Sequence, residues 1–131
     1  MSDSITKILV SVFELCLAGG LVNVWLLRFH KQTNYRGGNA KNMKEEFASY
    51  GLPAWAVYVV GFLKLCIAGT LIVVFLSPQH MYPFGVAALL VLGVLMLGAI
   101  RMHMRVHDRA IKMLPATLML LMTLATLFLV M

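Results

Sequence analysis

The chain has 131 residues, of which 61% are hydrophobic and only 12% are charged, and its formal net charge is +6. This composition excludes an ordinary soluble domain and indicates a protein surrounded by lipid. Two cysteines are too few for a disulfide framework or a four-thiolate zinc site. The positive charge does not indicate nucleic-acid binding, because the Lys and Arg residues flank apolar segments and no soluble domain would present them to a duplex.

Four apolar segments are each long enough to cross a bilayer as a helix, which takes roughly 20 residues. They cover residues 8–27, 53–76, 82–100 and 113–131. Little of the chain lies outside them, so we expect an all-α fold in which residues 1–131 form a single transmembrane four-helix bundle. We also expect a homo-oligomer, which a transporter in particular would need, because four helices of this length enclose little volume.

A short helix is predicted over residues 40–50, between the first two spans. Met43, Phe47 and Tyr50 recur there at helical spacing while charged residues cover the other faces, a pattern typical of a helix that lies along the lipid headgroups. Aromatic residues cluster near the same interface, where we expect them to act as anchors. They are Trp25, Tyr50, Trp55 and Tyr58.

Nine of the eleven Lys and Arg residues lie in two of the three segments that join the predicted spans. They are Arg28, Lys31, Arg36, Lys41, Lys44, Arg101, Arg105, Arg109 and Lys112. Cytoplasmic segments carry an excess of basic residues, so both segments are predicted to face the cytoplasm. We therefore expect a multi-pass protein of the cell inner (plasma) membrane with both termini outside.

Glu14 and Lys64 fall inside apolar segments, where a central charge costs roughly 2.5–3.5 kcal/mol on insertion scales and tends to be paired or functional. From the midpoints of the two segments, Glu14 should lie about 5 Å to the outer side and Lys64 about 1–2 Å to the inner side. We therefore predict an ion pair between them inside the bundle. The pair could fix the helix register without chemistry, or Glu14 could serve as a ligand or proton site, or the two could make no contact.

His103 and His107 stand one helical turn apart, which is a spacing of metal ligands. Two ligands do not make a site, and the interleaved cations would oppose a metal, so no metal site is predicted. Contacts with lipid headgroups fit this basic segment better. A further hypothesis is a quinone or lipid site lined by Trp55, Arg101 and His103. The sequence contains no recognisable catalytic motif, and we predict no catalytic residue.

Three short motifs resemble those of the DoxX-like family of small four-helix membrane proteins. They are MKEEFASYGLP at residues 43–53, GFLKL at 61–65 and GAIRMH at 98–103. Lys64 stands where the family usually has an acidic residue, and Asn23 stands where it commonly has a lysine. The resemblance implies functions that range from a subunit of thiosulfate:quinone oxidoreductase, through partners of redox or detoxification enzymes, to receptor-assembly chaperones.

We therefore expect a membrane subunit or partner-binding scaffold, linked to quinone or redox enzymes, rather than an autonomous enzyme. No cofactor is required by the sequence, although a quinone or a lipid could bind. The alternative is a small proton-coupled transporter of a cationic or hydrophobic solute that uses Glu14. A transporter would need Glu14 to be accessible from water, whereas a scaffold would tolerate its replacement.

Overall fold

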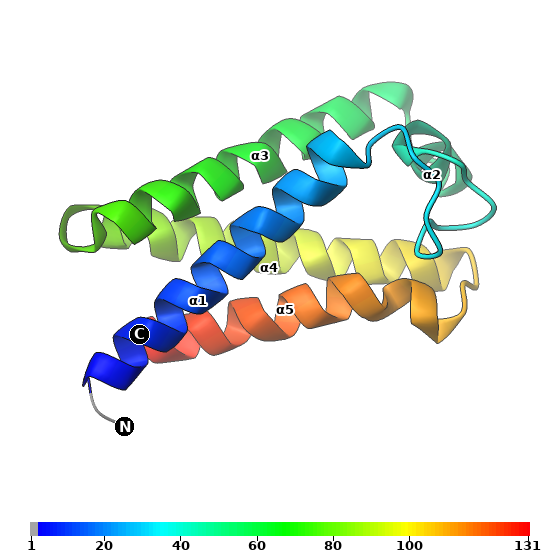
Figure 1. Cartoon of the computed structure of the whole chain (residues 1–131). Coiled ribbons are helices and arrows are strands. Elements are labelled where there is room, and N and C mark those ends of the chain that lie inside the picture. The colour runs from blue at the N-terminus through cyan, green and yellow to red at the C-terminus, as the bar shows by residue number, and fades with distance from the viewer. Residues whose placement is uncertain (1–2) are drawn as a thin grey trace.

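The computed structural model describes the backbone of residues 3–131 and the side chains of residues 4–77 and 83–131. Its regular structure in the described part of the chain is entirely helical (Figure 1). The elements are α1 (Asp3–Val22), the π-helical turn η1 (Asn23–Leu27), α2 (Met43–Ser49), α3 (Ala54–Leu76), α4 (Pro78–Arg105) and α5 (Ala110–Val130). The predicted all-α fold is confirmed.

Within residues 3–131, four helices are long and apolar enough to cross a membrane, as predicted. The spans are Ser4–Leu27, Ala54–Leu76, Pro83–Arg105 and Ala110–Val130. The third span was predicted over residues 82–100 and continues to Arg105, and the fourth was predicted over residues 113–131 and begins already at Ala110. An apolar segment marks only the residues that hydrocarbon surrounds, whereas helical hydrogen bonds continue to headgroup level, where Arg101 and Arg105 can be solvated.

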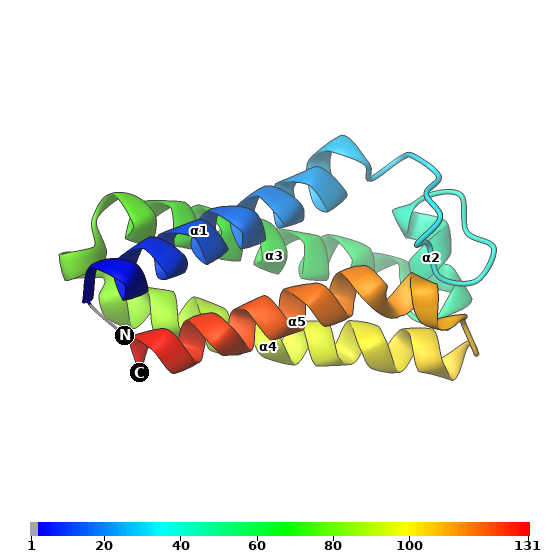
Figure 2. The same ribbon diagram turned by 60° about the horizontal axis from the view of Figure 1, so that its bottom comes forward.

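The four long helices form a closed ring. Helix α1 packs against α3 and α5, and α4 packs against the same two helices from the opposite side (Figures 1 and 2). Leu17, Leu21, Ile67, Leu71 and Leu92 meet along the axis of the ring, and each is at most 5% exposed. The beginning of α1 and the end of α5 lie at one end of the bundle, and α2 lies at the other (Figure 2).

Helix α1 ends in a wider turn that positions Trp25. The amide of Arg28 donates to the carbonyl of Asn23 at 2.9 Å, an i to i+5 bond that characterises a π-helix. The Trp25 ring is buried against Gly61 of α3, where an added Cβ would lie 2.8 Å from its Cε3. Only glycine permits this approach without a shift, so Gly61 sets how closely the two helices pack.

The predicted short helix exists but spans Met43–Ser49 rather than residues 40–50. Asn42 begins it, because its side chain accepts a hydrogen bond from the Glu45 amide at 2.9 Å. Gly51 follows its end with φ of 79°, a left-handed conformation that suits glycine. Together with the loop that follows η1, α2 folds over one end of the bundle.

Candidate functional site

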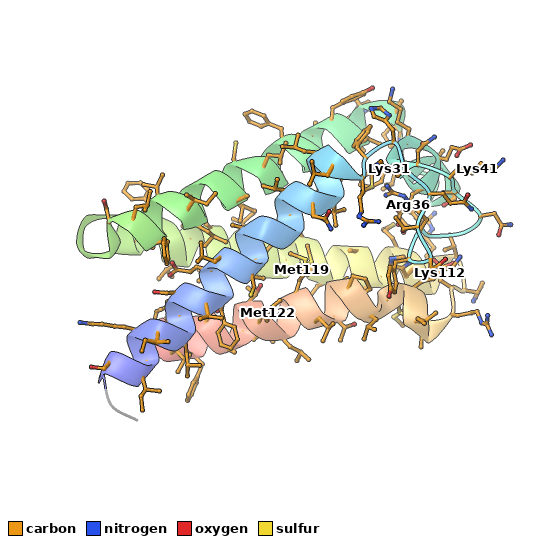
Figure 3. All side chains as sticks on the ribbon, viewed as in Figure 1. Lys31, Arg36, Lys41, Lys112, Met119 and Met122 are labelled. Atoms are coloured by element: carbon orange, nitrogen blue, oxygen red, sulfur yellow. The ribbon has the colours of Figure 1, made fainter. Side chains whose placement is uncertain are left out.

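Polar residues gather at the α2 end of the bundle, in a cluster that we call the polar cap, and all of their side chains except the half-buried Lys112 are buried. Its members are Arg36, Glu46, Tyr50, His103, Asp108 and Lys112. They come from the loop after η1, from α2 and the residue that follows it, from α4, from the α4–α5 link and from α5. Figure 3 labels Arg36 and Lys112, which lie together at this end. The cap thus joins segments far apart in sequence.

Glu46 lies at the centre of the cap and all its contacts are internal. Its Oε2 forms a salt bridge with Arg36 Nη1 at 3.0 Å, and both side chains are at least 90% buried. Its Oε1 accepts hydrogen bonds from the Tyr50 hydroxyl at 2.8 Å and from the Gly37 amide at 2.9 Å. These bonds offset the loss of solvation that a buried carboxylate suffers.

Arg36 also ties the loop to the end of the first span. Its guanidinium donates to the carbonyls of Arg28 and Phe29, and to that of Lys31 at 3.0 Å. Carbonyls just after a helix have no partner within the helix, so a buried cation is a suitable donor for them. One side chain therefore holds the loop against both η1 and α2.

A second set of bonds fixes the far side of the cap. His103 Nδ1 and Asp108 Oδ2 are 2.7 Å apart, and because the carboxylate can only accept, Nδ1 carries the proton. The Gly38 amide donates to Asp108 Oδ1 at 3.0 Å, and Lys112 Nζ lies 3.8 Å from the same oxygen. The α4–α5 link is thereby joined to the loop some 70 residues earlier.

Tyr50 connects the two halves of the cap. Its hydroxyl lies 3.5 Å from His103 Nε2 while it donates to Glu46. Burial raises the pKa of the Tyr50 hydroxyl well above its ordinary value, and the negative charge of Glu46 raises that pKa further. A Cβ at residue 37 would overlap the Tyr50 ring, so Gly37 is required beside it.

No sequence pattern predicted this cluster. Tyr50 and Trp25 were predicted as interface anchors, but both are 5% exposed and face inward. Trp55 and Tyr58 are exposed as anchors would be. The sequence did contain one signal of the cluster. Glu46 directly precedes Phe47 and lies on the apolar side of the predicted short helix, where an acidic residue is unexpected.

The structure places Glu14 and Lys64 at different depths and does not bring them together. The Lys64 ammonium lies over the Trp25 ring, 5.1 Å from its centroid. Trp25 follows Glu14 by eleven residues, or about 16 Å of helix at 1.5 Å per residue. None of the salt bridges found in the described part of the chain joins Glu14 to Lys64. The prediction from segment midpoints neglected the stagger between α1 and α3.

Glu14 instead lines a cavity of about 500 Å³ at the end opposite the cap, which we call the Glu14 cavity. All four long helices contribute to it. Its lining includes Lys7, Ser11, Glu14, Val74, Phe75 and Leu89. Glu14 is 6% exposed, and its carboxyl group makes neither a hydrogen bond nor a salt bridge among the described residues. Its role as a ligand site is a proposal.

The residues predicted to contact headgroups or a quinone are divided between two environments. Trp55 is 65% exposed on α3, and Arg101 is exposed on α4. His103 is 6% exposed and belongs to the polar cap. His107 does not lie beside His103, because it comes after the end of α4, has a φ of 57° and is exposed. In this structure, Trp55, Arg101 and His103 therefore do not line one common ligand site.

These features define a multi-pass membrane protein of four spans with a buried polar cap at one end. A sequence model of the DoxX-like family matches residues 36–126, more than half of the chain, so the chain belongs to the DoxX-like family. Comparison with curated proteins and with solved structures gave no significant match. The matched range contains every member of the polar cap but excludes Glu14.

Proposed function

We propose that this protein is a membrane subunit that binds an acidic protein partner through the outer surface of its polar cap. The observation that carries the proposal is the separation of charges at this end. The buried acids Glu46 and Asp108 are paired within the cap. Seven cations among the described side chains of this end face outward, namely Arg28, Lys31, Lys41, Lys44, Arg101, Arg105 and Arg109. Figure 3 labels Lys31 and Lys41 at this end.

The outer cations have little to neutralise them. Among the described residues of this end, Glu45 is the one exposed acid. Unneutralised charges on a fixed surface attract and orient a partner of opposite sign. The internal bonds of the cap hold the loop that carries Lys31 and Lys41, which supports a binding surface of defined shape.

The proposal also covers the class of the protein partner and the membrane in which the subunit lies. The resemblance to DoxX-like proteins supports a redox enzyme linked to the quinone pool, with a quinone or lipid near Trp55 and Arg101. The excess of basic residues at the cap end supports a cytoplasmic cap in an inner (plasma) membrane. We also propose that the subunit forms a homo-oligomer. The mass of the intact complex would give the number of subunits in it.

Cross-linking in native membranes tests the proposed partner. A carbodiimide joins an exposed lysine amine to a neighbouring carboxylate, and we expect Lys31 or Lys41 to be joined to an Asp or Glu of another protein. Reversing Lys31, Lys41, Arg105 and Arg109 to Glu should abolish the complex, whereas Lys7→Glu at the opposite end should preserve it. A complex that survives the four reversals would contradict the proposal. Retention of anionic lipid alone would contradict it too.

A second function has one observation in its favour. Proton-coupled transport of a cationic or hydrophobic solute would use Glu14, and the Glu14 cavity gives that residue a space for a solute. Leu17, Leu21 and Leu92 fill the bundle between this cavity and the cap, so transport requires a second conformation. Uptake driven by a proton gradient in proteoliposomes, and lost in Glu14→Gln, is the expected result for a transporter.

A further inference from the structure

The Glu14 cavity has the composition of a ligand site. Its volume of about 500 Å³ lies within the range of small-molecule sites, roughly 300–1,000 Å³. Val74, Phe75 and Leu89 give it apolar walls. Sites of this kind pair such walls with a small number of polar groups that fix the ligand's orientation. Here Glu14 is the acidic group in the described lining.

Glu14 is only 6% exposed, yet its carboxyl group faces the Glu14 cavity and has no partner side chain there among the described residues. Lys7 lines the same cavity but lies seven residues away, about 10 Å along the helix, and none of the four salt bridges of the described residues includes it. An ionised carboxylate only accepts hydrogen bonds. A buried one is stabilised by a cation that also donates.

We propose that the Glu14 cavity binds an ammonium group carried on an apolar body, with the Glu14 carboxylate as its counter-ion. The ammonium supplies positive charge and N–H donors, and the apolar body fills the space between the ends of α1, α3, α4 and α5. Lys7, nearer the beginning of α1, disfavours a second positive charge at that end of the ligand. The source of the ammonium is a free lipophilic amine or the headgroup of an aminophospholipid.

This site is separate from the proposed partner surface. The cavity lies at the termini end of the bundle, and Leu17, Leu21 and Leu92 lie between it and the polar cap. Glu14 also lies outside the range matched by the family, whereas the cap lies within it. Binding of an amine can therefore succeed or fail independently of binding of a protein partner.

Native mass spectrometry of the purified protein in detergent tests the site with dodecylamine and with dodecanol, its neutral analogue. We expect a single dodecylamine adduct and at least about tenfold weaker binding of dodecanol. Glu14→Gln should weaken dodecylamine by a similar factor. Glu14→Asp should retain measurable binding, and Glu45→Gln, an acid-to-amide change at the opposite end, should bind as the wild type does. Equal binding of the two ligands, or undiminished binding by Glu14→Gln, overturns the proposal.

A second measurement avoids variants altogether. Dicyclohexylcarbodiimide converts a buried carboxyl group into an N-acylurea. Bound dodecylamine should protect Glu14 of the wild-type protein from that product, either by keeping the carboxyl ionised or by capturing the activated carboxyl as a dodecyl amide with loss of dicyclohexylurea, and peptide mass analysis distinguishes the two adducts. Absence of protection overturns the proposal even if Glu14→Gln fails to fold. An aminophospholipid that co-purifies, and that dodecylamine displaces, identifies the lipid as the source. Binding of added dodecylamine to a lipid-free protein identifies a free amine.

Discussion

The ammonium of Lys64 lies over the face of the Trp25 ring, 5.1 Å from the centroid, deep between α1 and α3. Lys64 is 8% exposed and Trp25 is 5% exposed, so little solvent screens the contact. A cation over an indole face is attracted by about 2 kcal/mol when both groups are desolvated. This contact places a buried charge beside the π-helical turn and ties the first two spans together.

A double-mutant cycle should measure this contact. Trp25→Leu and Lys64→Met should each change the free energy of unfolding, partly because each also alters packing. The double-mutant cycle cancels these packing contributions of the single variants. We expect a coupling free energy of about 1–2 kcal/mol, measured by titration from mild detergent into sodium dodecyl sulfate. Strict additivity of the two variants would show that the ring does not stabilise the cation.

Gly61 should tolerate no side chain. An added Cβ would lie 2.8 Å from Trp25 Cε3, so Gly61→Ala forces the ring to shift and should lower the free energy of unfolding by about 1–3 kcal/mol. Gly69 on the same helix is the matched control, because nothing lies within 4 Å of its Cβ position. Gly69→Ala should be neutral or stabilising. Equal effects of the two substitutions would argue against the close approach of α1 and α3.

The buried salt bridge of the cap should be essential for its stability. Glu46→Gln preserves the shape of the side chain but leaves the Arg36 charge buried without a counter-ion, which costs roughly 3–5 kcal/mol. Glu45→Gln changes the exposed neighbouring acid and should cost less than about 1 kcal/mol. Thermal unfolding in detergent distinguishes the two. A Glu46→Gln protein as stable as Glu45→Gln would contradict the proposed role of the pair.

Tyr50 should make the protein lose stability at alkaline pH. Its hydroxyl must keep its proton to donate to Glu46, and burial together with the Glu46 charge raises its pKa above the ordinary value of about 10. The unfolded chain releases that proton first. The contribution of Tyr50 is therefore complete below pH about 10 and declines as the pH rises further.

We expect the free energy of unfolding to fall more steeply above pH about 10 in the wild type than in Tyr50→Phe. Other tyrosines and lysines titrate in both proteins, so the difference between the two curves isolates Tyr50. Parallel curves would mean that the hydroxyl ionises equally well in the folded and unfolded states.

The orientation can be tested with single cysteines. Cys16 and Cys66 are free and exposed on the lipid-facing surface, so both should first be replaced by Ala. A membrane-impermeant maleimide should then label Lys41→Cys only from the cytoplasmic side and Ser4→Cys only from the other. Labelling in the reverse sense would place the polar cap outside the cell and remove the basis for a cytoplasmic partner.

The sequence by itself determined the number and nature of the helices. A span depends on about 20 consecutive apolar residues, so hydropathy is sufficient to find it without knowledge of its neighbours. The motif at residues 43–53 likewise indicated both a short helix and the family, since both are encoded in contiguous residues. The concentration of Lys and Arg at one end could be read in the same way.

Only the tertiary structure decided which charges meet. Glu14 and Lys64 are both near the middle of apolar segments, but the packing of Trp25 on Gly61 sets the stagger of α1 against α3 and places the two charges at different depths. Arg36 and Glu46 are brought together by an irregular loop, which has no periodicity to reveal its path. The sequence specified which side chains are costly to bury, and three-dimensional packing selected their partners.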